Sequence, residues 1–329
     1  MSETKEAKKA KKAEKKAAKK GKKSGKGFKI VIAVLLVIAI AGEFYIGLTI
    51  PGKIENAITA ATSATSGDES NDPGIEFKEG TYGGVEFKTL EDVVKYYNDA
   101  YNKTKAKTAD FKNSGGDVET LYAFIGEENL QIKEGSLLVG GSANAMLNGM
   151  VPGILSGIFK PNVCGLPPSS NRHPADDTDS AGVSMGTSRV TVEDVKAGNV
   201  VDNGDGTITI TLVPVATEMS EKGMDPQGHF FNTLGALDSV VGSISVLSFS
   251  QGSASENVKA TYEGGKAVVT IDPASGEIVK ADYNMVVNVD VQHANVTVLK
   301  DKSASLTILY DNHFPVSDAT MTEKGYTPV

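Results

Sequence analysis

The sequence is poor in the residues that cross-link a protein or bind a transition metal. It contains one cysteine, Cys164, and four histidines among 329 residues. A single cysteine excludes an internal disulfide, so the stability of the fold has to come from its core. The histidines follow neither H-x-x-x-H nor H-x-H spacing, which argues against a zinc site. The sequence also lacks a Walker phosphate loop and a dinucleotide-binding glycine pattern, and we expect no cofactor.

Positive charge is scarce outside the N-terminal segment. Met1–Lys29 contains 13 lysines and three glutamates, whereas the whole chain has a net charge of -8. This asymmetry indicates an electrostatic boundary within the molecule. We interpret residues 1–27 as a lysine-rich cytoplasmic tail that either sets membrane topology or attracts anionic lipid. Nucleic acid is not an expected partner, because the tail offers bare lysines rather than a pattern of arginine and aromatic contacts.

The segment 28–50 has almost no charge and predicts a transmembrane helix. Between Ile30 and Ile50 only Glu43 is charged, and a helix of about 20 residues spans the hydrocarbon core of a bilayer. The lysines that precede this segment place the N-terminus in the cytoplasm by the positive-inside rule. These features predict a signal-anchored, single-pass protein of the cell membrane whose C-terminal domain lies outside.

A cleaved signal peptide is the alternative interpretation of the same segment. Ala39-Ile40-Ala41 follows an apolar stretch and resembles a cleavage site. Apolar residues resume with Phe44 and Tyr45, which favours the uncleaved span. In both interpretations the C-terminal domain is exported, and in the second it is secreted after cleavage near Ala41. A large exported domain without disulfides is typical of a bacterial cell envelope.

Composition divides the exported part into a stalk and a folded domain. Residues 51–84 are rich in Ala, Ser, Thr, Gly and acids, which predicts a flexible stalk. The folded domain is expected to cover residues 85–329. Its first helix is predicted over Leu90–Tyr101, where apolar residues recur at helical spacing behind a capping-box pattern. Further helices are expected over Ala143–Phe159, with a kink at its proline, and over Phe231–Val241.

Much of the remaining sequence alternates between apolar and polar residues, which predicts strands with one buried face. Thr207–Leu212 is the clearest case, and Asp202–Gly206 supplies the turn of a hairpin before it. Five C-terminal strands are expected, at 257–263, 266–272, 278–291, 295–299 and 303–310. We therefore predict an α+β fold in which a curved antiparallel sheet, like a half-barrel, packs on two or three helices.

Two short segments and the order of elements carry a resemblance to a known group. They are T-V-E-D-V at Thr191–Val195, before a hairpin, and I-D-P-A-S-G-E-I at Ile271–Ile278, in the terminal meander. With the helix after the predicted anchor, they resemble uncharacterised membrane-anchored ectodomains of Gram-positive bacteria, and the layout is similar to the half-barrels of lipoprotein-carrier proteins. The resemblance covers about Val85–Ser317 as an order of elements. It implies a cavity between sheet and helices that holds a lipid, and it assigns no residue.

One sequence pattern is typical of serine hydrolases. Gly182-Val-Ser184-Met-Gly186 matches G-x-S-x-G, in which the serine lies on a tight turn between a buried strand and a helix. The acidic residues before it are not typical of a buried strand, and a polar segment follows it. We therefore interpret the match as a chance pattern and assign no catalytic residue.

Two acidic segments are candidate metal sites. The turn Asp202–Gly206 resembles a calcium loop, but with Asp205 as a ligand the twelfth position is Leu212 instead of a bidentate glutamate. The second segment holds the densest group of candidate ligands, namely His173, Asp176, Asp177 and Asp179. Several converging acids can hold calcium, but the segment also has the composition of a solvated surface loop. No metal site is assigned.

These observations predict a membrane-anchored extracytoplasmic protein that is not an enzyme and binds a lipid or another apolar ligand. Ala143–Phe159 is predicted to be a core helix, with a lid over a lipid cavity as the alternative. A structural or interaction protein of the envelope with a filled core is the second hypothesis. The third hypothesis is an envelope hydrolase. The sequence gives it the least support, since the paired carboxylates of such an enzyme cannot be recognised among so many acids without a fold.

Overall fold

The structure is a computed structural model that describes most of the chain after residue 74. The described residues are 75–122, 125–139, 142–143, 162–171, 173, 177–218, 220, 222–233, 247–296 and 299–329. The predicted tail 1–27, the predicted span 28–50 and the segment Ala143–Phe159, apart from its first residue, lie outside them.

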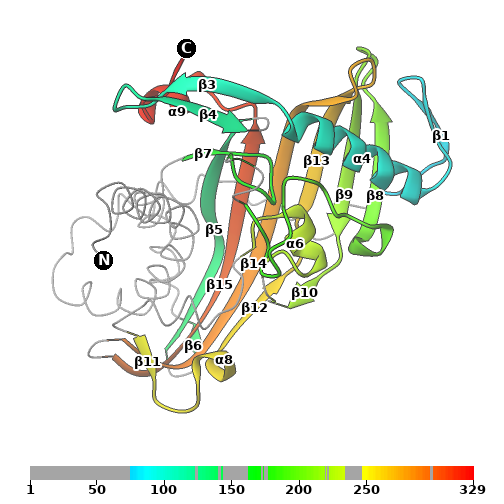
Figure 1. The fold of residues 1–329 in the computed structure, drawn as a ribbon. Coiled ribbons are helices and arrows are strands. Elements are labelled where there is room, and N and C mark those ends of the chain that lie inside the picture. The colour runs from blue at the N-terminus through cyan, green and yellow to red at the C-terminus, as the bar shows by residue number, and fades with distance from the viewer. Residues whose placement is uncertain are drawn as a thin grey trace, which may run out of the picture.

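An antiparallel sheet of eleven strands forms the body of the domain (Figure 1). Its main path runs β6-β5-β15-β14-β13-β9-β8, and the shorter strands β7, β10, β11 and β12 pair with members of that path. The strands are β5 (Gly126–Val139), β6 (Ser142–Ala143), β7 (Asn162–Cys164), β8 (Val195–Asp202), β9 (Ile208–Pro214), β10 (Thr217–Glu218), β11 (Leu247–Phe249), β12 (Val258–Tyr262), β13 (Lys266–Asp272), β14 (Glu277–Val296) and β15 (Leu299–Phe314).

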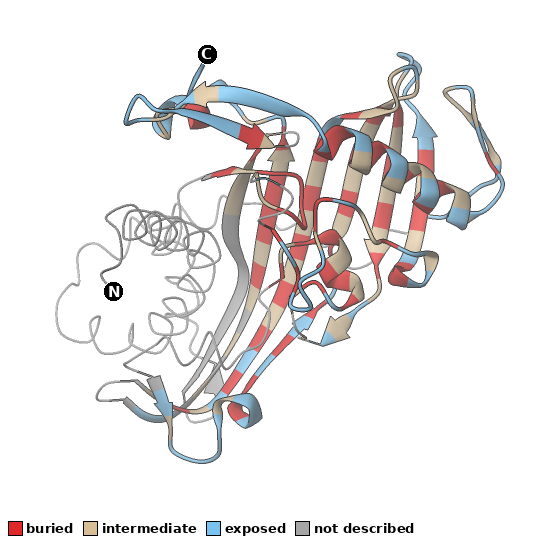
Figure 2. Cartoon of the chain, viewed as in Figure 1, coloured by how far each residue is buried: buried red, intermediate tan, exposed pale blue. Residues whose placement is uncertain are grey.

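The alternation of the sequence determines which face of the sheet is buried. In β9, Ile208, Ile210 and Leu212 are buried, and the threonines between them are partly exposed. β14 continues this pattern over more of its length, with Tyr283 and Met285 fully buried. Figure 2 shows the resulting rows of buried residues along neighbouring strands. We call the buried side the inner face and the opposite side the outer face.

One long helix lies across the inner face. It is α4 (Leu90–Lys105), and it begins with the predicted capping box, in which Thr89 and Asp92 satisfy each other's backbone N–H groups. Val93, Tyr97 and Tyr101 are buried against the sheet. The first predicted helix is therefore confirmed, and its period of 3.6 residues explains which side chains enter the core.

The predicted α+β architecture, a sheet packed on two or three helices, is wrong. The other described helices are short: α6 (Pro226–Phe230), α8 (Ala254–Asn257), α9 (Asp318–Glu323) and the 3-10 helix η2 (Val192–Asp194). Phe231, where a further helix was predicted to begin, has extended dihedral angles and ends α6 instead. The described fold is therefore mostly β, because long alternating segments that favour strands outnumber those with helical spacing.

The prediction of a single-pass membrane protein also needs correction. Among the described residues, no helix is both long enough and apolar enough to cross a bilayer. The segment 28–50, on which that prediction depended, is outside the described residues. The structure thus gives no support to a transmembrane helix or a membrane anchor.

Two small sheets complete the fold. The hairpin of β1 (Gly80–Tyr82) and β2 (Val85–Phe87) lies near β8, where the N–H of Gly83 donates to Asp202 at 2.9 Å. A three-stranded sheet of β16 (Thr327–Pro328), β3 (Thr108–Lys112) and β4 (Val118–Tyr122) holds the C-terminus against β3, the strand that follows α4 (Figure 1). These elements extend the domain beyond the central sheet.

Aromatic side chains fill the space between α4 and the inner face. The ring of Tyr97 lies 5.9 Å from that of Phe230, Phe231 lies 6.4 Å from Tyr283, and Tyr283 lies 6.2 Å from Phe314, measured between ring centroids. The buried hydroxyls of Tyr97 and Tyr283 are hydrogen-bonded to each other at 2.8 Å. This part of the inner face is therefore a packed core.

Candidate functional site

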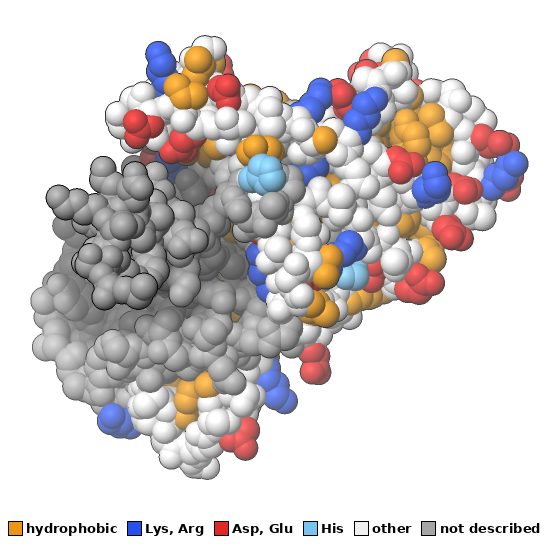
Figure 3. Space-filling view, in the orientation of Figure 1, with side chains coloured by type: hydrophobic (Ala, Val, Ile, Leu, Met, Phe, Trp, Pro, Cys, Tyr) orange, Lys and Arg blue, Asp and Glu red, His pale blue; other side chains and the backbone are white. Residues whose placement is uncertain are grey.

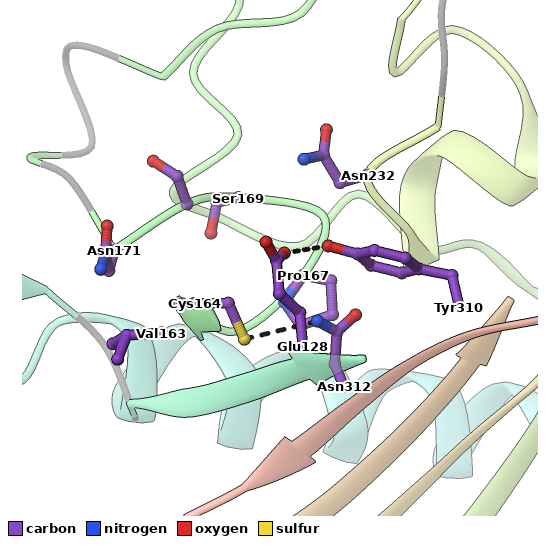
Figure 4. Close-up of a pocket in the computed structure, with 11 residues that line it drawn as sticks. Glu128, Val163, Cys164, Pro167, Ser169, Asn171, Asn232, Tyr310 and Asn312 are labelled. Carbon is purple, nitrogen blue, oxygen red and sulfur yellow. Dashed lines mark hydrogen bonds between the residues drawn. The ribbon is translucent and has the colours of Figure 1, made fainter. Parts of the chain in front are cut away.

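A small pocket lies on the inner face where β5 and β15 meet the loop that follows β7. Its volume is about 90 Å³. Its polar lining comes from five parts of the chain (Figure 4). They are β5 with Glu128, the end of β7 with Cys164, the following loop with Ser169, the segment after α6 with Asn232, and β15 with Tyr310 and Asn312. Figure 3 shows acidic and basic side chains interspersed over the described part of the surface.

Strand pairing brings the floor of the pocket together. In the register of β5 and β15, Glu128 is opposite Asn312 and Leu130 is opposite Tyr310. Because side chains alternate along a strand, Tyr310 and Asn312 project to the same inner face. Glu127, the neighbour of Glu128, projects to the outer face and accepts a hydrogen bond from the hydroxyl of Ser317 at 2.7 Å.

A hydrogen bond between Tyr310 and Glu128 defines the electrostatics of the floor. The Tyr310 hydroxyl donates to the Glu128 carboxylate. Burial raises the pKa of Tyr310 well above its usual value, and the nearby charge of Glu128 adds to this effect. The phenol consequently stays protonated and acts as the donor, while Glu128 is the acceptor.

Cys164 forms one wall of the pocket as a neutral thiol. The amide nitrogen of Asn312 donates to its Sγ atom at 3.3 Å. Burial raises the pKa of the Cys164 thiol well above its usual value, and Glu128 raises it further. Because the thiolate is the nucleophilic form of cysteine, this environment does not activate Cys164.

Side chains from α4 hold the loop over the pocket. The Tyr101 hydroxyl donates to the carbonyl of Leu166 at 3.2 Å and contacts the hydroxyl of Ser169 at 3.1 Å. Lys105 is 1% exposed, and its Nζ donates to the carbonyl of Ser170. Burial lowers the pKa of Lys105 to about 8, whereas the charges of Asp177 and Cys164 act in the opposite direction. The loop is thus fixed by buried polar contacts.

The structure places the G-x-S-x-G serine outside this pocket's lining. Ser184 forms an isolated bridge with Thr178 and accepts a hydrogen bond from the N–H of Gly186 at 3.1 Å. Bends surround it, and neither a buried strand before it nor a helix directly after it occurs in the described segment 177–190. The strand–turn–helix geometry that activates such a serine is not formed.

The acids near His173 have structural contacts. Asp177 accepts hydrogen bonds from the N–H of Ser170 and from Lys222, the latter at 3.3 Å. Asp179 forms an ion pair with Arg189. The ring of His173 packs on Tyr122 with centroids 5.0 Å apart, and Asp176 is outside the described residues. In the described part of the chain, no group of three His, Cys, Asp or Glu side chains is placed to hold a metal ion.

The turn that was compared with a calcium loop joins β8 to β9, as the hairpin prediction requires. Asp202 accepts a hydrogen bond from the N–H of Gly204 at 2.9 Å, and Asp205 accepts one from the N–H of Thr207 at 2.9 Å. These carboxylates therefore stabilise the turn itself.

Sequence reasoning missed the residues of the pocket. Within β15, the inner-face row consists of Ile308, Tyr310, Asn312 and Phe314, all buried. An asparagine in an apolar row is an unusual feature, because a buried amide costs free energy unless it is hydrogen-bonded. Asn312 is visible as an exception in the sequence, but its neighbours in the pocket lie more than a hundred residues away along the chain. Only the fold shows that Glu128 is opposite Asn312 and that Cys164 contacts it.

Comparison of the chain with protein-family models, with curated proteins and with solved structures gives no match. The function is therefore inferred from the chemistry of the pocket.

Proposed function

We propose that this protein is a non-catalytic binding protein and that the pocket beside Glu128 receives a small polar molecule. The observation that supports the proposal most directly is the polar lining of a cavity within an apolar face. Asn312 is 4% exposed and lies between the buried aromatic residues Tyr310 and Phe314. Specific ligand sites commonly combine an apolar setting with a few convergent polar groups.

The nucleophile candidates at the pocket support a binding role over a catalytic one. The pKa of Cys164 is raised, and the Ser169 hydroxyl donates to the carbonyl of Leu166 at 2.8 Å. A hydroxyl becomes a nucleophile when an adjacent base accepts its proton, and a backbone carbonyl is not such a base.

A lipid ligand is supported less well than a polar one. The described inner face beside the pocket is packed with aromatic rings, and the pocket itself is lined by amides, hydroxyls and a carboxylate. These features are closer to the hypothesis of a filled core than to that of a lipid carrier. Lipid binding and an envelope partner remain predictions from the sequence.

Titration of the full chain, labelled with ¹⁵N, against a set of small polar and apolar molecules tests the proposed function. We expect polar members to shift the amide resonances of Cys164, Ser169 and Asn312 while the outer face is unaffected. The variant Asn312→Leu should abolish these shifts because leucine removes the amide from the pocket. Asn288→Leu is the matched control, since Asn288 lies on the outer face and accepts a hydrogen bond from Thr307 at 2.8 Å. Shifts produced by apolar molecules alone would contradict the proposal.

A further inference from the structure

Two asparagine side chains line the pocket from opposite sides. Asn171 belongs to the loop after β7, and Asn232 follows α6. Both residues are partly exposed, and in Figure 4 their amides lie on either side of Ser169. Within the described part of the chain, neither side chain has a hydrogen-bond partner. Because an amide has two N–H donors and a carbonyl acceptor, the pocket presents both kinds of group to a ligand.

Backbone contacts fix the position of Asn171. Its carbonyl accepts a hydrogen bond from the N–H of Tyr122 at 2.9 Å, and the carbonyl of the preceding Ser170 accepts one from Lys105. The loop also folds back on itself, since a Cβ atom added to Gly165 would lie 2.5 Å from the backbone nitrogen of Asn171. The amide is therefore held in place before a ligand arrives, which lowers the entropic cost of binding.

Asn232 is fixed by its two neighbours in the sequence. Phe231 and Thr233 are 2% and 4% exposed, and the N–H of Thr233 donates to the carbonyl of Phe231 at 2.9 Å. This hydrogen bond closes a three-residue turn with Asn232 at its centre. With both flanking residues buried, the turn presents the side chain of Asn232 to the pocket.

The one charged residue that lines the pocket in the described part of the chain is already engaged. The carboxylate of Glu128 accepts a hydrogen bond from the hydroxyl of Tyr310 and takes part in a further interaction. Lys105, behind the loop, is 1% exposed and is separated from the pocket by the carbonyl to which it donates. The lining thus favours a ligand that forms hydrogen bonds and carries no charge of its own.

On the basis of the binding function proposed above, we propose that the ligand of this pocket is a neutral polyhydroxyl molecule whose hydroxyls pair with the side-chain amides of Asn171 and Asn232. A hydroxyl both donates and accepts, so it can pair with either end of an amide. The volume of about 90 Å³ restricts the ligand to a short polyol or to one edge of a sugar ring whose remainder projects into solvent.

Four three-carbon probes test this inference on the full chain, labelled with ¹⁵N, at neutral pH. They are glycerol, 1-propanol, propylammonium chloride and sodium propionate. We expect glycerol to shift the resonances of the pocket with an affinity at least about tenfold above that of each other probe, a difference of about 1.4 kcal/mol. Equal or tighter binding of 1-propanol or of either ion would overturn the inference and leave the proposed binding function standing. If these probes and the wider polar set all fail to bind, the proposed function fails as well.

Leucine substitutions separate the two amides from the rest of the pocket. Asn171→Leu and Asn232→Leu each remove one amide at nearly constant size, so each should reduce the preference for glycerol over 1-propanol. Asn288→Leu makes the same change on the outer face and should leave the preference intact. The dispersion of the amide resonances in each spectrum shows whether the variant is folded. An unchanged preference in folded Asn171→Leu and Asn232→Leu proteins would refute the role of these amides.

Discussion

At the scale of single residues, Lys105 links the pocket loop to the pH dependence of stability. Its pKa falls to about 8 in the folded protein, below the usual value of 10.5, because the side chain is buried. Between these two values the unfolded chain binds more protons than the folded one. Stability conferred through this group therefore rises with pH over that window, by at most about 1.4 kcal/mol per pH unit.

Comparing the wild-type protein with the Lys105→Met variant isolates the contribution of Lys105 to the pH dependence of stability. We expect the free energy of unfolding of the wild type to increase relative to that of the variant between pH 8 and about 10, as measured by urea denaturation. Below pH 8 the difference should be constant. Lys103→Met is the control, because Lys103 is exposed on the same helix. A wild-type curve parallel to that of Lys105→Met throughout would show that folding does not lower the pKa of Lys105.

At the scale of elements, the contact of β5 with β15 depends on a residue without a side chain. A Cβ atom added to Gly126 would lie 2.5 Å from both the carbonyl oxygen of His313 and the ring of Phe314. Such an approach is too close for non-bonded atoms, so one strand would have to move. Since Glu128 lies two residues along the same strand, the pocket should be displaced too.

The variant Gly126→Ala is therefore expected to lower the free energy of unfolding by about 1–3 kcal/mol and to weaken ligand binding at the pocket. Gly115→Ala serves as a comparison, because a Cβ atom added there would lie 3.2 Å from its nearest contact, the side chain of Asn113, instead of 2.5 Å. Equal stability of the two variants in chemical denaturation would contradict the tight strand contact.

The elements that could be predicted from the sequence are those with a local signal. α4 was predicted from its helical spacing and capping box, and the hairpin of β8 and β9 from its turn residues. The break expected at His293 was wrong, because β14 continues through it with an irregular register, and His293 adopts a φ of 52°. Strands were expected between the first two helices, but no bounds were predicted for β5. The pocket was missed because its residues lie on strands that pair over long distances in the sequence. Local periodicity predicts a strand but not the strand with which it pairs.

At the scale of the whole molecule, we propose that the domain lies outside the cytoplasm. The lysine-rich N-terminal segment and the apolar stretch after it support export, and Ala39-Ile40-Ala41 supplies a cleavage site for the alternative in which the domain is secreted. If cleavage occurs there, the mature protein is expected to begin at Gly42 and to be recovered without detergent. N-terminal sequencing of protein purified from its source checks this, and an intact N-terminus at Met1 in cytosolic extract would contradict it.

The position of β15 in the sheet also affects how the chain folds during synthesis. β15 lies between β5 and β14, although β5 is synthesised much earlier. The long edge of β5 has no β15 to pair with until the ribosome has completed residues 299–314. Long-range pairing of this kind is slow and leaves strand edges open to aggregation. We therefore expect a nascent chain of this protein to need protection at β5 nearly until translation ends. A nonsense mutation before β15 would release a polypeptide that lacks Tyr310 and Asn312 and the strand that joins β5 to β14.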